Sequence, residues 1–256
     1  MKTIILCGGL GTRISEETSV RPKPMVEIGG YPIVWHIMKW YESHGYNDFL
    51  LALGYKGDYI KDYFLNYRRK KSDLKIDFQS NSIVYSNSEL ENWNLSLVDT
   101  GELTMTGGRL LRFKNYLSDG EIFMVTYGDG VSNIDINKLV SFHKSHGKIA
   151  TISAVRPPVR FGELDIDNNN VVNSFQEKPQ AGNGWINGGF FVFDTRIFNF
   201  IDGDRTLLER EPLEKLAKLN ELVAYKHEGF WQCMDTIRDR DLLQDLWSNN
   251  LAPWKV

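Results

Sequence analysis

The sequence has few cysteines and almost no net charge. Two of its 256 residues are cysteines, Cys7 and Cys233, far apart and without the spacing of a metal site. This argues against a disulfide scaffold and favours a reducing compartment such as the cytoplasm. With 30 Lys and Arg against 33 Asp and Glu, no overall field favours nucleic acid or an anionic membrane. We therefore expect any anion to be bound by a local site.

Long hydrophobic runs are missing as well. The N-terminal apolar run reaches only Leu6, which is too short for a signal peptide, and no stretch approaches the ~20 apolar residues that span a bilayer. We expect a soluble cytoplasmic protein without membrane or nucleic-acid partners. A chain of 256 residues is long enough for one large α/β domain with a sizeable core.

Apolar runs alternate with segments of helical periodicity in the first half of the sequence. Helical spacing is clear at residues 32–44 and 57–67, and fully apolar runs occupy residues 48–53 and 122–125. This alternation predicts a Rossmann-like, doubly wound, mostly parallel sheet flanked by helices. Ligands of such sheets bind beyond the carboxyl ends of the strands.

The second half reads differently, with short strands predicted at residues 161–166 and 171–177. Helical spacing returns at residues 211–219 and 236–247. We expect a smaller β-rich portion here, packed against the first sheet. In the first half, residues 74–79 are predicted as a strand, and the polar residues 81–92 are predicted as an exposed loop or a weak hairpin. A predicted helix covers residues 107–117.

A glycine cluster follows the first apolar run. Gly8, Gly9 and Gly11 allow a sharp bend that aims several amide N–H groups at one anion. Arg13 and Lys23 add positive charge nearby. The spacing is neither that of a Walker loop nor that of a dinucleotide fingerprint. It predicts a strand that ends in a polyphosphate cradle.

A second candidate site is the turn Gly128-Asp129-Gly130 at the end of a buried strand. An acidic residue flanked by glycines can approach a Mg²⁺–phosphate group, and Mg²⁺ takes one or two protein carboxylates. We select Asp235 as the second carboxylate. The alternatives are an ordinary turn for Asp129 and the N-cap of the next helix for Asp235.

Other polar residues have two interpretations each. Lys178, beside Glu177 at the end of a predicted strand, either holds a phosphate or is a surface ion. Asn187 either meets hydroxyl groups or pairs with backbone. The segment that ends at Arg109 either binds a ligand or is a helix N-terminus. His36 lies within an amphipathic helix and is expected to be packed there.

Taken together, these motifs resemble the signature of the sugar-1-phosphate nucleotidylyltransferases, over nearly the whole chain. The motifs that carry the resemblance are Gly8-Gly9-Leu10-Gly11-Thr12-Arg13, Pro22-Lys23-Pro24, Met105-Thr106-Gly107-Gly108-Arg109, Gly128-Asp129-Gly130, Phe175-Gln176-Glu177-Lys178-Pro179 and Ile186-Asn187-Gly188-Gly189. The resemblance implies a single nucleotidyltransferase domain over residues 1–256. Residues 1–150 would bind the nucleotide, and residues 151–256 the sugar phosphate.

The resemblance also implies substrates and roles. It implies CTP and glucose 1-phosphate as substrates, Mg²⁺ as cofactor, and attack of a sugar-phosphate oxygen on the α-phosphorus. Arg13, Lys23, Asp129 and Asp235 would be catalytic, with the metal on the two carboxylates. Nucleotide contacts are expected from Leu6, Gly8, Gly9, Leu10, Gly11, Thr12, Arg13, Lys23, Thr104, Arg109 and Gly128, and sugar-phosphate contacts from Gly162, Glu177, Lys178 and Asn187.

The choice of base can be argued from hydrogen bonding. Cytosine N3 carries no proton and needs a donor, and Arg109 has only donors. We therefore expect Arg109 and Thr104 to read the cytosine edge. A different sugar phosphate or nucleotide stays open, as does a catalytically silent nucleotide sensor. We expect a homo-oligomer, in which Trp247 and Trp254 either make subunit contacts or close the core.

Overall fold

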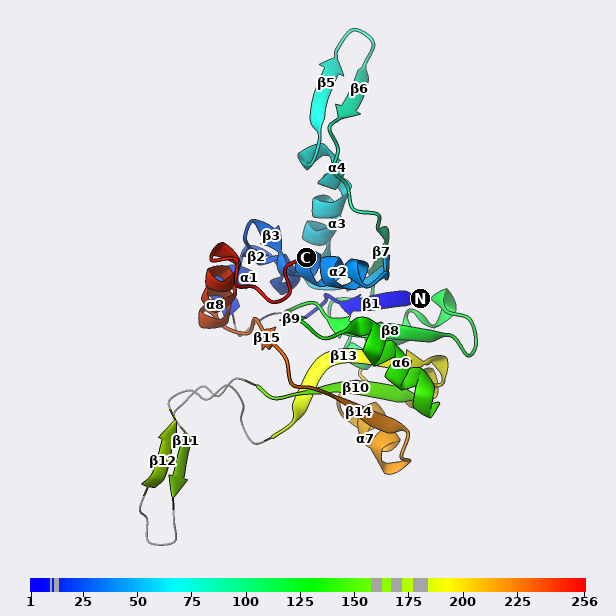
Figure 1. Cartoon of the computed structure of the whole chain (residues 1–256). Coiled ribbons are helices and arrows are strands. Elements are labelled where there is room, and N and C mark those ends of the chain that lie inside the picture. Colours follow the sequence, from blue (N-terminus) through cyan, green and yellow to red (C-terminus); the bar gives the residue numbers. More distant parts are fainter. Residues whose placement is uncertain (10, 12–13, 158–162, 167–171, 177–183) are drawn as a thin grey trace.

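A seven-stranded sheet forms the centre of the computed structural model (Figure 1), which describes residues 1–9, 11, 14–157, 163–166, 172–176 and 184–256. The strands lie in the spatial order β14-β10-β13-β8-β1-β4-β7. Their bounds are β1 Lys2–Leu6, β4 Asp48–Leu53, β7 Asn94–Asp99, β8 Ile122–Tyr127, β10 Ala150–Val155, β13 Ile186–Asp194 and β14 Leu222–His227. Only β13 runs antiparallel to its neighbours in this sheet. The prediction of a mostly parallel sheet is confirmed.

Shorter strands form two-stranded pairs, and helices fill the connections. The pairs are β2 Glu27–Ile28 with β3 Tyr31–Pro32, β5 Asp73–Asp77 with β6 Ser82–Ser86, β9 Gly130–Ser132 with β15 Trp231–Cys233, and β11 Glu163–Ile166 with β12 Val172–Gln176. The α-helices are α1 Ser15–Thr18, α2 Ile33–Ser43, α3 Gly57–Leu65, α4 Tyr67–Lys70, α5 Thr106–Leu111, α6 Ile136–His146, α7 Glu211–Lys218 and α8 Ile237–Ser248. Short 3₁₀ turns are η2 Lys23–Met25, η3 Lys114–Tyr116 and η4 Thr195–Phe200.

The core has two layers, one on each face of the sheet. Successive residues of β1 point to opposite faces, so Ile5 joins the layer under α2 and α6, and Ile4 joins the layer under α5 and α7. Both side chains are completely buried. Burial on both faces explains why the central strands read as continuous apolar runs.

The C-terminal half adds strands to the same sheet. β10, β13 and β14 extend it beyond β8, so the main sheet is continuous across the two halves of the chain. Opposite the glycines of β13, the register of the pairing shifts between Ile152 and Ala154 of β10, which marks a β-bulge at this point. Trp254 is 2% exposed and stacks on Phe230. It therefore closes the core, as one of the two interpretations of this residue required.

The structure corrects one strand prediction and one helix prediction. The strand expected at residues 74–79 does not join the main sheet but pairs with β6 as a hairpin that projects from the body (Figure 1). Of the polar stretch at residues 81–92, only residues 82–86 join this hairpin, and residues 87–92 form no strand, so the stretch is partly hairpin and partly loop. The helix expected at residues 107–117 begins earlier, at Thr106, and ends at Leu111. In the part of the chain that the structure describes, no helix is long and apolar enough to cross a membrane.

His36 is packed, as the sequence predicted. It is 2% exposed, its Nε2 donates to the Ile28 carbonyl at 2.8 Å, and its ring meets Trp35 and Trp247 edge-on. Burial lowers the pKa of His36 to about 4, although the backbone hydrogen bonds act in the opposite direction. The folded protein therefore keeps this imidazole neutral where an unfolded chain would protonate it.

This burial predicts an acid-sensitive stability. Between pH 6.5 and about 4 the unfolded state takes up a proton at His36 that the folded state does not, so the free energy of unfolding falls as the pH falls, by up to about 3 kcal/mol. We expect His36→Gln to flatten this slope in urea titrations at pH 7, 6, 5 and 4. Equal slopes for the variant and the wild type would show that His36 does not carry the effect.

Candidate active site

Two neighbouring parallel strands bring the glycine loop and the acidic turn together. β1 and β8 pair with Leu6 opposite Tyr127, so both strands end at the same edge of the sheet. The backbone N–H of Gly128 donates to the Leu6 carbonyl at 3.1 Å, which joins the two chain segments just beyond the strands. The residues that follow these strands, Gly8 and Asp129, therefore lie at one site.

A small second pairing brings Asp235 to the same place. β15 pairs antiparallel with β9, with Cys233 opposite Gly130. The Met234 N–H then donates to the Asp129 carbonyl at 2.8 Å. Asp235, the next residue, is held beside Asp129 although the two are far apart in the sequence.

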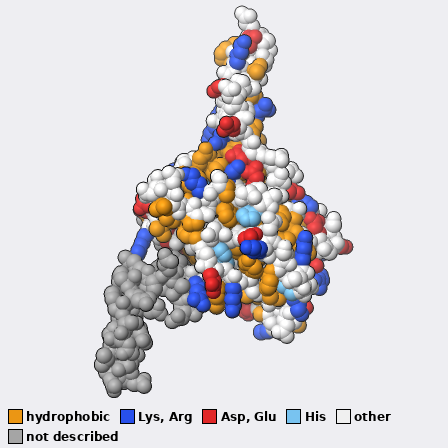
Figure 2. Space-filling model, viewed as in Figure 1, with side chains coloured by type: hydrophobic (Ala, Val, Ile, Leu, Met, Phe, Trp, Pro, Cys, Tyr) orange, Lys and Arg blue, Asp and Glu red, His pale blue; other side chains and the backbone are white. Residues whose placement is uncertain are grey.

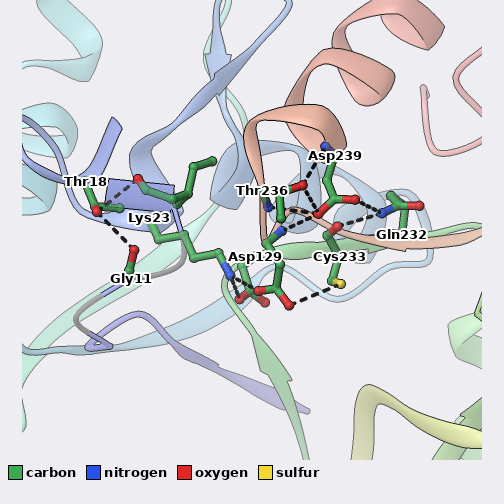
Figure 3. A network of polar contacts seen from close by, with 10 residues as sticks. Gly11, Thr18, Lys23, Asp129, Gln232, Cys233, Thr236 and Asp239 are labelled. Carbon is green, nitrogen blue, oxygen red and sulfur yellow. Dashed lines mark hydrogen bonds and ion pairs between the residues drawn. The ribbon is translucent and has the colours of Figure 1, made fainter. Parts of the chain in front are cut away.

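The start of α8 fixes the backbone of Asp235. Thr236 is the N-cap, and Asp239 completes a capping box with it. The Asp239 carboxylate also accepts from the backbone N–H of Asp235 at 3.1 Å and of Thr236 at 2.9 Å. Figure 3 shows Thr236 and Asp239 directed toward each other. Asp235 is thus not the helix cap, and this alternative for its role is wrong.

Lys23 points between the two carboxylates. Its Nζ lies 2.6 Å from Asp129 Oδ2 and 2.5 Å from Asp235 Oδ1, and Lys23 is only 9% exposed. Figure 3 shows the Lys23 side chain extended toward Asp129. Burial by itself lowers the pKa of Lys23, but attraction to Asp129 and Asp235 and the hydrogen bonds to them raise it above its ordinary value. Lys23 therefore stays charged near neutral pH.

The two carboxylates fit a Mg²⁺ site of the kind that binds a nucleotide. Both direct an oxygen at the same point, where the ammonium of Lys23 lies. No group of three or more His, Cys, Asp or Glu that could hold a metal ion occurs among the described residues. Two carboxylates are enough for Mg²⁺, which keeps waters and substrate phosphate oxygens as its other ligands.

A cavity of about 340 Å³ opens beside this cluster. Ten residues predicted as site residues line it: Leu6, Gly8, Gly9, Gly11, Lys23, Thr104, Arg109, Gly128, Asp129 and Asp235. Six others, Leu10, Thr12, Arg13, Gly162, Glu177 and Lys178, lie outside the described residues. The structure thus brings together every predicted nucleotide or metal residue that it describes.

Asn187 lies in a smaller neighbouring cavity, of about 40 Å³, which shares Tyr127 and Asp129 with the larger one. Its Oδ1 accepts from the backbone N–H of Gly189 at 2.8 Å, and its Nδ2 lies 3.4 Å from the Tyr127 hydroxyl. Asn187 therefore pairs with the backbone, which is one of its two interpretations. The amide nevertheless lines a space next to the acidic turn.

Arg109 has a role that the sequence did not suggest. It lies inside α5 and is 4% exposed. Its Nη1 donates to Thr100 Oγ1 and to the carbonyls of Leu53 and Gly101, and its Nη2 donates to the carbonyls of Gly8 and Glu102. The guanidinium therefore ties the glycine loop to the ends of β4 and β7.

The glycines beside Arg109 allow close packing. A Cβ on Gly108 would lie 2.6 Å from the Asp204 Cα, and one on Gly107 would lie 2.8 Å from the Thr206 carbonyl oxygen. These glycines are thus needed where α5 meets residues 203–208. Sequence reasoning also missed Tyr127 as a site residue, although it directly precedes the acidic turn.

Known proteins resemble this chain over most or all of its length. A family model described as nucleotidyl transferase matches residues 2–237. The chain is 54% identical to the glucose-1-phosphate cytidylyltransferase of Salmonella typhi, across 100% of this chain and 99% of that protein. It is 43% identical to the probable glucose-1-phosphate cytidylyltransferase of Bacillus subtilis, across the full length of both.

Solved structures show the same fold. HddC of Yersinia pseudotuberculosis is 27% identical and superimposes with a TM-score of 0.69, covering 96% of this chain and 99% of that one. A UDP-glucose pyrophosphorylase, complexed with UDP-glucose, has a TM-score of 0.69 at 15% identity, covering 97% of this chain and 98% of that one. At this identity the second likeness concerns the fold alone.

The contact between Gly8 and Arg109 predicts a large difference between neighbouring glycines. A Cβ on Gly8 would lie 2.2 Å from Arg109 Nη1, whereas a Cβ on Gly9 would have nothing within 4 Å. We expect Gly8→Ala to lower the free energy of unfolding by about 1–3 kcal/mol through overpacking, and Gly9→Ala to change it by less than about 0.5 kcal/mol. Urea unfolding of both variants measures this, and equal effects would contradict the contact.

Proposed function

Because this chain belongs to the nucleotidyl transferase family, we propose that it forms CDP-glucose and pyrophosphate from CTP and α-D-glucose 1-phosphate. The observation that carries the proposal is the 54% identity to the Salmonella typhi enzyme across the whole of both chains. The convergence of Lys23, Asp129 and Asp235 at one cavity supports it, since these groups suit a triphosphate and its metal.

In the proposed reaction a phosphate oxygen of the sugar phosphate attacks the α-phosphorus of CTP in line. A new P–O bond forms as the bond to the β-phosphate oxygen breaks, and pyrophosphate leaves. Such transfers need positioning and charge stabilisation rather than a covalent intermediate. The amides of Gly8 to Gly11 and Arg13 would hold the triphosphate, and Lys23 would meet charge that builds up near the α-phosphate.

Mg²⁺ would supply charge neutralisation of the phosphates when bound by Asp129 and Asp235. On the sugar side, Lys178 would bind the attacking phosphate. Glu177, Asn187 and the backbone of Gly162 would take sugar hydroxyls. Of these four sugar-side residues the structure describes Asn187, and its place in the cavity beside Asp129 is consistent with the proposed role.

For the base, we propose that Thr104 and Arg109 lie at the cytosine edge. Both line the larger cavity. Arg109 already donates through both terminal nitrogens to protein acceptors, so base reading and support of the glycine loop are separate roles to be distinguished. The product would feed deoxysugar and O-antigen polysaccharide synthesis. We infer a cytoplasmic location, which the free thiols of Cys7 and Cys233 favour.

The test is release of pyrophosphate from purified protein with Mg²⁺, each of the four ribonucleoside triphosphates or dTTP, and a panel of sugar 1-phosphates. Turnover confined to CTP and glucose 1-phosphate supports the proposal, and preference for another pair refutes it. The same panel applied to Arg109→Ala separates the two roles of this residue. A changed CTP/UTP ratio indicates base reading, whereas a loss common to all nucleotides indicates loop support.

Replacement of Lys23 tests the alternative of a silent nucleotide sensor. We expect Lys23→Ala to lower kcat at least about 100-fold, because the lost charge acts where the transition state gains it, with a much smaller change in CTP affinity. Stopped-flow rates and calorimetric titration with CTP measure the two effects. Lys39→Ala, on the outer ion pair with Glu42, is the control. A loss confined to CTP affinity would favour the sensor.

We propose in addition that the protein is a homo-oligomer, and that the β5–β6 hairpin contributes to the subunit contacts. Leu74 pairs with Tyr85 and Ile76 with Ile83, so these four side chains share one face of the hairpin. Ile76 is 50% exposed and Ile83 is 55% exposed. An isolated two-stranded hairpin is only marginally stable in water, and Figure 2 shows hydrophobic side chains on this projecting arm. A second copy of the chain would cover them.

Sedimentation equilibrium tests this contact. We expect the wild type to sediment as an oligomer and Ile76→Asp to shift the protein toward the monomer, because a charge on the apolar face cannot be buried without a partner. Lys75→Gln changes the opposite face of the same strand, so it serves as the matched control. A monomeric wild type, or an unchanged mass for Ile76→Asp, would refute the proposed contact.

A further inference from the structure

Glu209 lies outside every motif of the sequence, yet it connects the two cavities of the site. It precedes α7 and is half-buried. The Tyr127 hydroxyl donates to its Oε1 at 2.5 Å, and the Thr106 hydroxyl donates to its Oε2 at 2.6 Å. Both are short hydrogen bonds to a carboxylate, a kind that is stronger than a hydrogen bond between two neutral groups.

The hydrogen bond from Tyr127 links Glu209 to the smaller cavity. Tyr127 is the last residue of β8, two residues before Asp129, and lines both cavities. Its hydroxyl is 3.4 Å from the Asn187 amide nitrogen. Its ring packs against Gly189, where an added Cβ would lie 2.5 Å from the ring carbon Cδ2. The Tyr127 hydroxyl therefore contacts both Glu209 and Asn187.

The hydrogen bond from Thr106 links Glu209 to the turn that carries Thr104. Thr106 begins α5, and its hydroxyl accepts from the Leu208 N–H at 2.9 Å while it donates to Glu209. The Met105 N–H donates to the Asp204 carbonyl at 2.8 Å. The segment that ends in Glu209 thus holds the edge of the larger cavity in place.

We infer that Glu209 is a positioning residue that couples the two substrate subsites, since it holds Tyr127, which orients Asn187, and Thr106, which fixes the turn carrying Thr104. The inference rests on the proposed function, in which Asn187 meets the sugar and Thr104 meets the base. One carboxylate then sets both contacts. Disturbance at either hydroxyl reaches the other subsite through Glu209.

A double-mutant cycle tests this coupling. Tyr127→Phe and Thr106→Val each remove one hydroxyl and keep the approximate size of the side chain. We expect Tyr127→Phe to raise the KM for glucose 1-phosphate about tenfold, the cost of one hydrogen bond to a charged group, with kcat changed less than about threefold. In the double variant we expect the change in the KM for glucose 1-phosphate to differ by more than about threefold from the product of the changes in the two single variants.

The same cycle is then repeated in Glu209→Gln, which keeps the side chain's size but leaves one acceptor oxygen for two hydroxyl donors. In the Glu209→Gln background we expect the double-variant effect to equal the product of the two single effects. The KM values for both substrates should rise in Glu209→Gln itself. Glu214→Gln, an exposed residue on α7, is the control and leaves both KM values unchanged. Multiplicative effects in the wild-type background, or coupling that persists in Glu209→Gln, would overturn the inference.

Calorimetric binding of CTP, and of glucose 1-phosphate in the presence of a non-reacting CTP analogue, gives a readout that does not require turnover. A wild type that releases no pyrophosphate with CTP and glucose 1-phosphate refutes the proposed function. An active wild type whose binding cycle shows no coupling refutes the role of Glu209 alone. The two failures are therefore distinguishable.

Discussion

The ion cluster of Lys23, Asp129 and Asp235 is the constraint on which the site depends. Removing charged groups from water is costly unless they are paired, and deleting one partner leaves an uncompensated charge. Here one mostly buried ammonium contacts both carboxylates. The three residues come from η2, from the turn after β8 and from the turn after β15. The parallel pairing of β1 with β8 and the short pairing of β9 with β15 must both form before the charges can meet.

How much of the fold the sequence predicts depends on where a strand lies. β4 was predicted with its observed bounds, because a strand buried on both faces is apolar throughout. β7 and β14 were missed. They are the outer strands of the sheet, and half-exposed edge strands carry polar residues such as Asn94 and Lys226 that weaken the apolar signal. Of the projecting hairpin, β5 was predicted as a strand, but periodicity could not show that this strand leaves the main sheet.

The site was predictable where motifs are local. Lys23 and Asp129 lie beside glycines or prolines that mark turns, so the sequence points to them. The partners of Arg109 are mostly backbone carbonyls, which carry no residue-type signal, and only the fold brings Leu53 and Gly8 to its guanidinium. Glu209 bonds to hydroxyls 82 and 103 residues away. A contact of that range leaves no spacing pattern in one sequence.

The pairing of Lys23 with two carboxylates allows one arrangement to serve two states. Among the described residues that line the larger cavity, Lys23 and Arg109 balance Asp129 and Asp235, and the Lys23 ammonium occupies the point where both carboxylates direct an oxygen. In the proposed reaction Asp129 and Asp235 would ligate Mg²⁺. The positive charge of a divalent cation would repel the Lys23 ammonium from its position between the two carboxylates. Lys23 would then be free to meet phosphate oxygens, and under the proposed function its pairing with Asp129 and Asp235 would hold its charge at the site until substrate replaces these partners.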